Sequence, residues 1–162
     1  MACVSCEPAA SATWRAALPV ALPGGPTVVA SAHVHLEPEL VSVPLARRWV
    51  AAHAAGIDSD ASDVLLLLTS ELVTNAVIHA RTEVELALTA TSDDVLVCVH
   101  DLDLGRREQR THERDGGRGL ALVASLADAY GLLQHPQGGK TWWFRLTKQP
   151  SLNPTRAEGG AR

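Results

Sequence analysis

Residues 70–80 read SELVTNAVIHA, and this stretch decides how the rest of the chain is interpreted. Glu71 and Asn75 are four residues apart, so in a helix they point to the same side. His79 extends this polar stripe by one turn. Apolar residues recur at helical spacing on the other side, which predicts a helix from about residue 58 to residue 80 with one polar stripe; they are Leu65, Leu68, Leu72, Ala76 and Val77.

A carboxylate and a carboxamide one helical turn apart can divide a task between them. The amide oxygen of Asn75 is a neutral oxygen ligand of the kind that Mg²⁺ accepts. The carboxylate of Glu71 can take a proton from an attacking hydroxyl. The spacing alone favours a solvated polar helix face, because polar pairs at this spacing are common.

The segments on either side of this helix predict an α+β fold. Alternating or continuous apolar runs predict strands, and helical spacing with Gly56 and Gly131 as stops predicts two more helices. The expected strands are 28–36, 84–88, 95–99, 132–135 and 141–146, and the expected helices are 43–55 and 118–130. This order favours a two-layer sandwich in which a mixed, mostly antiparallel sheet is covered on one face by helices.

The sequence His100-Asp101-Leu-Asp103-Leu-Gly105 follows directly on the apolar strand 95–99. Ligand sites are common where a strand ends and an aperiodic loop starts. A buried carboxylate at this place could accept a hydrogen bond from an exocyclic amine such as that of adenine. The same residues also suit an ordinary turn.

Three glycines in Gly116-Gly117-Arg118-Gly119-Leu120 lead into the helix expected at 118–130. Glycines allow close backbone approach, and the free amides of a helix N-terminus bind anions. Arg118 adds a permanent cation. A flexible Gly-rich loop is the alternative interpretation. The charged residues of the preceding loop could clamp a polyphosphate or form a solvated lid.

The composition excludes several classes of protein. The 162 residues carry a net charge of -4, with 46% hydrophobic and 20% charged residues. We expect one folded unit at 28–148, a disordered leader at 1–27 and a disordered tail at 149–162. The acidic balance argues against a nucleic-acid partner, and no apolar run is long enough to predict a membrane span. The chain is expected in the cytoplasm.

Cysteine and histidine give no clear metal or disulfide pattern. Cys3 and Cys6 form an isolated C-x-x-C, for which His33 and His35 are the only nearby additional zinc ligands. A frayed terminus is the simpler interpretation. Cys98 lies in an apolar run and is expected to be a small buried residue. The histidines otherwise show no ligand spacing.

The ordered series of motifs resembles the GHKL (Bergerat-fold) ATP-binding superfamily, and more closely its anti-sigma-factor serine kinases of the RsbW and SpoIIAB type. The resemblance rests on four stretches: SELVTNAVIHA at 70–80, D-x-D-x-G at 101–105, GGRGLALV at 116–123 and Gly138-Gly-Lys140-Thr141. The resemblance covers about residues 40–146. Four motifs in one order are far more specific than any of them alone.

The resemblance implies a site for ATP and Mg²⁺. By position, Asn75 would hold Mg²⁺ and Glu71 would be the general base. Asp101 would accept from the adenine amine, with Thr141 helping through a water. The remaining nucleotide-binding positions implied by the motifs are Gly105 beside adenine and Gly117, Arg118, Gly119 and Leu120 at the phosphates, under a lid at 104–116.

The resemblance also implies protein partners. These are an anti-anti-sigma factor, whose Ser or Thr receives the γ-phosphate, and a sigma factor that the protein sequesters; relatives of this kind often form homodimers. One position departs from the pattern, because Asp103 replaces the first glycine of the D-x-G-x-G box. A side chain there restricts the backbone and adds negative charge. This departure favours an alternative, a non-catalytic switch module that acts through protein contacts.

Overall fold

The computed structural model describes residues 27–54, 56–103 and 117–148. The structured elements follow the order β-α-α-β-β-α-β-β. They are β1 (Val28–Leu36), α1 (Ser42–His53), α2 (Ser59–His79), β2 (Val84–Thr91), β3 (Asp94–Asp101), α3 (Gly117–Leu126), β4 (Ala129–Gln134) and β5 (Lys140–Thr147). The expected tail, the expected lid and nearly all of the expected leader lie outside the described residues.

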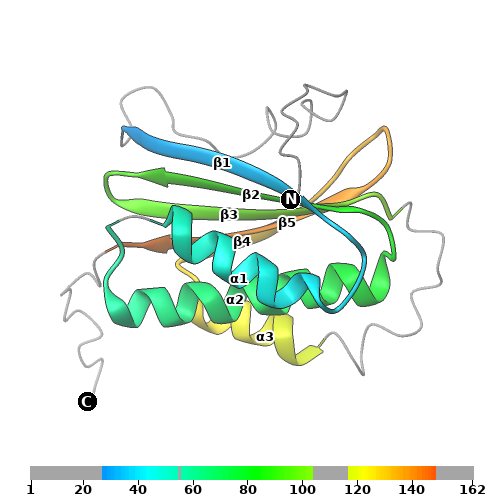
Figure 1. The fold of residues 1–162 in the computed structure, drawn as a ribbon, viewed down its shortest axis with the longest axis horizontal. Coiled ribbons are helices and arrows are strands. Elements are labelled where there is room, and N and C mark those ends of the chain that lie inside the picture. Colours follow the sequence, from blue (N-terminus) through cyan, green and yellow to red (C-terminus); the bar gives the residue numbers. More distant parts are fainter. Residues whose placement is uncertain (1–26, 55, 104–116, 149–162) are drawn as a thin grey trace, which may run out of the picture.

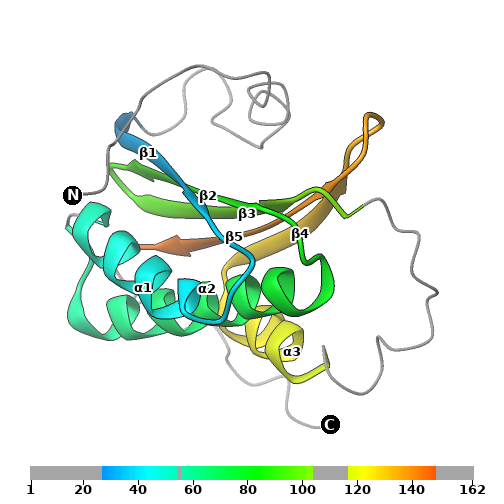
Figure 2. The same cartoon turned by 45° about the vertical axis from the view of Figure 1, so that its right-hand side comes forward.

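The strands form one five-stranded sheet in the order β1-β2-β3-β5-β4, and every neighbouring pair is antiparallel. All three helices cover the same face of this sheet (Figures 1 and 2). The predicted two-layer α+β architecture is confirmed. Its expected mixture of strand directions is not seen, because each described strand pairs only with antiparallel neighbours.

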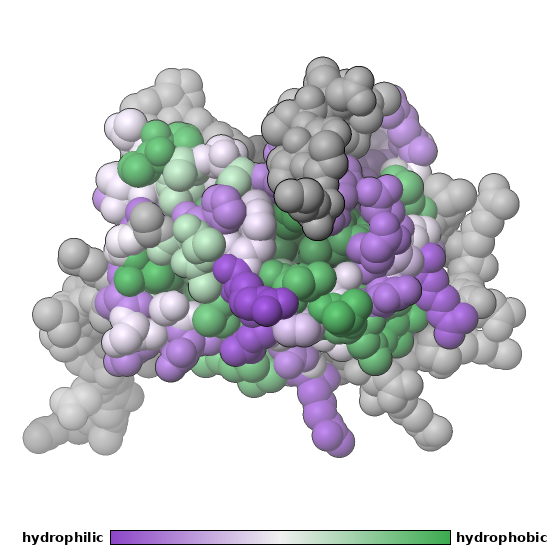
Figure 3. All heavy atoms as spheres, in the orientation of Figure 1, coloured by the Kyte–Doolittle hydropathy of each residue, from purple (hydrophilic) through white to green (hydrophobic). Residues whose placement is uncertain are grey.

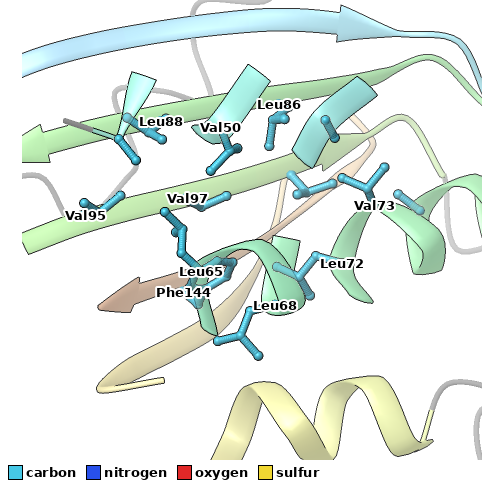
Figure 4. Close-up of a cluster of buried hydrophobic side chains, with 14 of the residues drawn as sticks. Val50, Leu65, Leu68, Leu72, Val73, Leu86, Leu88, Val95, Val97 and Phe144 are labelled. Carbon is cyan, nitrogen blue, oxygen red and sulfur yellow. The ribbon is translucent and has the colours of Figure 1, made fainter. Parts of the chain in front are cut away.

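The core lies between the helices and the sheet because each element turns its apolar side inward. Val95, Val97 and Val99 alternate along β3 toward the helices, and Phe144 does the same on β5. Figure 4 shows Val95, Val97 and Phe144 facing residues of α1 and α2, among them Val50, Leu65, Leu68, Leu72 and Val73. Burial of this apolar surface is the main stabilising term of the fold.

The long helix α2 is the central element of the helical layer. Its N-cap is Asp58, whose side chain accepts a hydrogen bond from the Ala61 N–H at 2.9 Å. Of the described helices, α2 alone is long and apolar enough to cross a membrane, judged by length and composition only. In the fold it packs as a core helix, with its apolar residues buried against the sheet.

The predicted helix at 118–130, with Gly131 as its stop, was wrong at its C-terminal end. Helix α3 ends at Leu126, and Gly131 lies inside β4, where it is paired with Trp143 of β5. A Cβ on Gly131 would stand 2.9 Å from three atoms of the Trp143 indole. The glycine is therefore needed for packing beneath an aromatic ring, and it does not stop a helix.

The outer face of the sheet, away from the helices, carries a smaller apolar cluster of Ala87, Leu96 and Cys98, with Trp143 packed against it. Cys98 is buried, as expected, and burial raises the pKa of its thiol to about 12.

The helical side of the molecule shows polar and apolar side chains interspersed on its surface (Figure 3).

Candidate functional site

Three of the sequence motifs meet at one end of the molecule. The C-terminal half of α2, the end of β3 and the start of α3 all lie at the right-hand end in Figures 1 and 2. The sheet places the end of β3 next to the start of β5, since Asp101 is paired with Lys140. The fold thus gathers residues as far apart in the sequence as Glu71 and Lys140.

Glu71 of α2 lies directly against Gly119 of α3. A Cβ added to Gly119 would overlap Glu71 Oε2 and would stand 3.4 Å from both the Cβ and the Cδ of Glu71. The missing side chain at position 119 therefore provides the space that the Glu71 carboxylate uses. This contact holds the carboxylate beside the first turn of α3, where backbone N–H groups lack helical partners.

Asp101, the last residue of β3, is 1% exposed and faces the helical side of the sheet. Its Oδ1 accepts a hydrogen bond from the Asp103 N–H at 3.0 Å. Its Oδ2 is buried and has no hydrogen-bond partner within the described structure. Burial raises the pKa of this carboxyl, and the charge of Lys140 opposes the rise. The free acceptor, Oδ2, is the kind of group that a ligand amine would satisfy.

Lys140 is the direct cross-strand neighbour of Asp101 and points to the same side of the sheet. Its Nζ lies 3.6 Å from Asp101 Oδ1 and donates a hydrogen bond of 2.7 Å to Asp103 Oδ2. The negative charge that Asp103 adds to the first glycine box is therefore balanced by this lysine. The cluster of Asp101, Asp103 and Lys140 is called the carboxylate–lysine corner below.

Thr141 lies on the opposite face of the sheet from Asp101, because neighbouring residues of a strand point to opposite faces. It is paired with His100, and its hydroxyl lies 3.0 Å from His100 Nδ1 and 2.8 Å from His135 Nε2. The motif position implied that Thr141 helps Asp101 bind adenine. The structure does not bring the two side chains together. The pKa of His100 is lowered to about 4, mainly by burial and to a smaller extent by the charge of the nearby His135.

Gly139 fixes the approach of β5 to the end of β3. Its φ is +88°, a conformation that favours glycine. A Cβ there would lie 2.6 Å from the carbonyl oxygen of Asp101 and 3.0 Å from His100 Cε1. The close backbone contact brings Lys140 opposite Asp101.

The other expected site residues are placed as follows. Asn75 is half-buried on α2, one turn after Glu71. Helix α3 begins at Gly117, Arg118 is exposed in its first turn, and Leu120 is partly buried against the core. Gly105 lies outside the described residues.

Two residues of the site, Gly139 and Lys140, belong to a motif that the sequence interpretation quoted, but it gave neither of them a role. Alternation contains the signal for Lys140, because it shares the parity of the buried residues Phe144 and Leu146 on β5. Asp101 shares the parity of the buried valines of β3 in the same way. Only the pairing of the two strands, which the sequence does not state, places them opposite each other.

The arrangement can recognise a nucleotide. Asp101 Oδ2 offers a buried acceptor for an exocyclic amine, and the first turn of α3 with Arg118 offers N–H groups and a cation to phosphates. The unsatisfied Oδ2 and the space at Gly119 both fit such a ligand. Glu71 lies beside the same helix start, where it can accept a proton.

Comparison with known proteins agrees with this geometry. Residues 36–145 match the histidine kinase-like ATPase domain family, HATPase_c_2. A search of curated proteins found no match. Among solved structures, the RsbU and RsbW domains of Rv1364c from Mycobacterium tuberculosis superpose with a TM-score of 0.56 at 20% identity. That match covers 75% of this chain and 34% of the other, so the chain spans about a third of its length.

The structural match shows a shared fold, and the family match extends over well over half of the chain. It includes α2, β3, α3 and most of β5, which carry the described site residues. An ATPase domain of this kind binds a nucleotide, as the site chemistry also indicates. The chain belongs to the family of histidine kinase-like ATPase domains.

Proposed function

We propose that this protein is an ATP-dependent regulatory serine/threonine kinase, which phosphorylates an anti-anti-sigma partner and sequesters a sigma factor. The carrying observation is the contact of Glu71 with Gly119, which holds a carboxylate at the start of α3. The family match supports ATP as the nucleotide. The similar structure that contains an RsbW domain supports the choice of partners.

In this mechanism the buried Oδ2 of Asp101 accepts from the adenine amine and orients the base. The N–H groups at the start of α3 and the Arg118 guanidinium hold the phosphates. Glu71 accepts the proton of the partner's hydroxyl as its oxygen attacks the γ-phosphorus, and the bond from the γ-phosphorus to the bridging oxygen breaks so that ADP leaves. Asn75 would hold Mg²⁺, which supplies charge neutralisation when bound. Phosphoryl transfer needs chiefly such positioning and charge stabilisation.

Calorimetric titration of ATP with Mg²⁺ tests the nucleotide site. We expect saturable binding to the wild-type protein and loss of binding in Asp101→Ala. The catalytic role is tested by Glu71→Gln, which keeps the size of the side chain and removes the base. This variant should bind ATP normally and should not transfer ³²P from labelled ATP to an anti-anti-sigma protein. Transfer at the wild-type rate would refute the role of Glu71.

A second candidate function is a switch module without catalysis, and the carboxylate–lysine corner favours it. Lys140 contacts both Asp101 and Asp103. The adenine base of a bound nucleotide must therefore share the carboxylate–lysine corner with the ammonium group of Lys140. If the wild-type protein binds no ATP at millimolar concentration but binds a sigma factor, the switch module replaces the kinase.

We also propose that the protein acts in the cytoplasm as a homodimer. Light scattering on the purified chain should give about twice its mass of 17.2 kDa. A monomer that still binds a sigma factor would refute the dimer alone.

A further inference from the structure

We propose that the outer face of the sheet binds a divalent transition-metal ion, Zn²⁺, through His33, His35 and Glu85. One potential ligand atom from each residue lies within 4.8 Å of those of the other two. This cluster is called the outer-face triad. It is independent of the proposed nucleotide site and of the proposed kinase activity.

The sheet brings the triad together by its alternation and register. His33 and His35 are two residues apart on β1, so both point to the same face. That face is the outer one, because the intervening Val34 and the following Leu36 pack against the core. Glu85 of β2 is the direct cross-strand partner of His35. The triad therefore spans two neighbouring strands.

Two imidazoles and a carboxylate form a ligand set that Zn²⁺ accepts, with metal–ligand bonds of about 2.0–2.2 Å. Both histidines are exposed, so their rings can turn to shorten the separations while Glu85 stays in place. Glu85 is only 3% exposed. A nearby dication would offset part of the cost of keeping this carboxylate buried. Water can complete the coordination sphere.

A neighbouring carboxylate orients one of the imidazoles. His35 Nδ1 lies 2.9 Å from Oε1 of Glu83, which directly precedes β2. A histidine that donates its Nδ1–H to a carboxylate presents the lone pair of Nε2, and metal-binding histidines commonly have this second partner. The ring contact between His33 and His35, with centroids 6.2 Å apart, keeps the second imidazole close.

The site is separate from the nucleotide site. Asp101 and Lys140 point toward the helices, whereas Glu85 shares the outer face with His100, its partner on β3. The metal would join β1, which among the described strands pairs with β2 alone, to the rest of the sheet. Bound Zn²⁺ would therefore hold this edge strand in place and stabilise the folded state.

The test is a calorimetric titration of Zn²⁺ into the full chain after chelator treatment. All proteins carry Cys3→Ser and Cys6→Ser, so that the N-terminal thiols contribute no ligand. We expect one Zn²⁺ per chain and a higher Tm with Zn²⁺. The double variant His33→Ala/His35→Ala should lose both effects. The control His53→Ala removes a histidine on α1 and should change neither.

Glu83→Gln provides a second, finer test, because it changes the orientation of His35 without removing a ligand. We expect its Zn²⁺ affinity to fall by about tenfold, whereas Glu37→Gln, an exposed change nearby, should not alter it. Circular dichroism shows whether each variant is folded. No Zn²⁺ binding by the parent protein overturns the proposal, as does unchanged binding by a folded double histidine variant.

Discussion

Glu71 and Gly119 are in contact across the α2–α3 interface, and the absence of a side chain at position 119 makes room for the carboxylate. The contact joins the candidate base to the candidate phosphate-binding turn. It also means that the position of the carboxylate depends on the distance between two helices.

Gly119→Ala should therefore abolish phosphate transfer while preserving the fold. The new methyl group displaces only the end of a flexible side chain, and alanine is favoured over glycine inside a helix by about 1 kcal/mol. Thermal unfolding should show an unchanged or slightly higher Tm. The exposed Ala124→Ser on the same helix serves as the control. Wild-type transfer by Gly119→Ala would show that the contact has no catalytic role.

Nucleotide binding should weaken in acid because of Asp101. Burial raises the pKa of this carboxyl, and protonation reduces its ability to accept from the base amine. Binding is therefore expected to fall as the pH falls through the raised pKa. Comparing ATP affinity from pH 4 to pH 7 with that of Asp101→Asn separates this effect from the titration of ATP itself. Parallel pH profiles in the two proteins would contradict the assignment.

Lys140→Met should raise the pH at which ATP binding is lost in acid. The lysine charge lowers the pKa of Asp101, so its removal lets burial raise that pKa further. The midpoint of ATP binding against pH is the quantity to measure. Lys148→Met is the matched control, because Lys148 follows the other end of β5. An identical shift in both variants would point to net charge instead of the carboxylate–lysine corner.

Gly131→Ala should destabilise the protein by about 1–3 kcal/mol, the usual cost of overpacking. Its φ is not positive, so the backbone itself can accommodate alanine. The cost arises from the Trp143 indole, three atoms of which lie 2.9 Å from the position of the new Cβ. Urea unfolding measures the loss. Gly119→Ala is a useful comparison, because the same change there meets a flexible neighbour; equal stability losses would argue against the role of Trp143.

The sequence alone predicted the elements whose causes are local. The start of α2 near Asp58, the helical period that follows it, the alternation in β2 and the continuous apolar run in β3 are properties of neighbouring residues, and the structure confirms each of these elements. The motif series also indicated the correct family. These features depend on capping and on apolar periodicity, which can be read along the chain.

Tertiary structure decided what depends on strand pairing and on contacts between distant residues. The register of β3 with β5 places Lys140 beside Asp101 and directs Thr141 to the outer face. The pairing of β4 with β5 places Gly131 against the Trp143 indole, and the β1–β2 register brings Glu85 to His35. A one-residue change of register would move every one of these side chains to the other face. The sequence does not state that register, because it results from packing of the whole sheet against its helices.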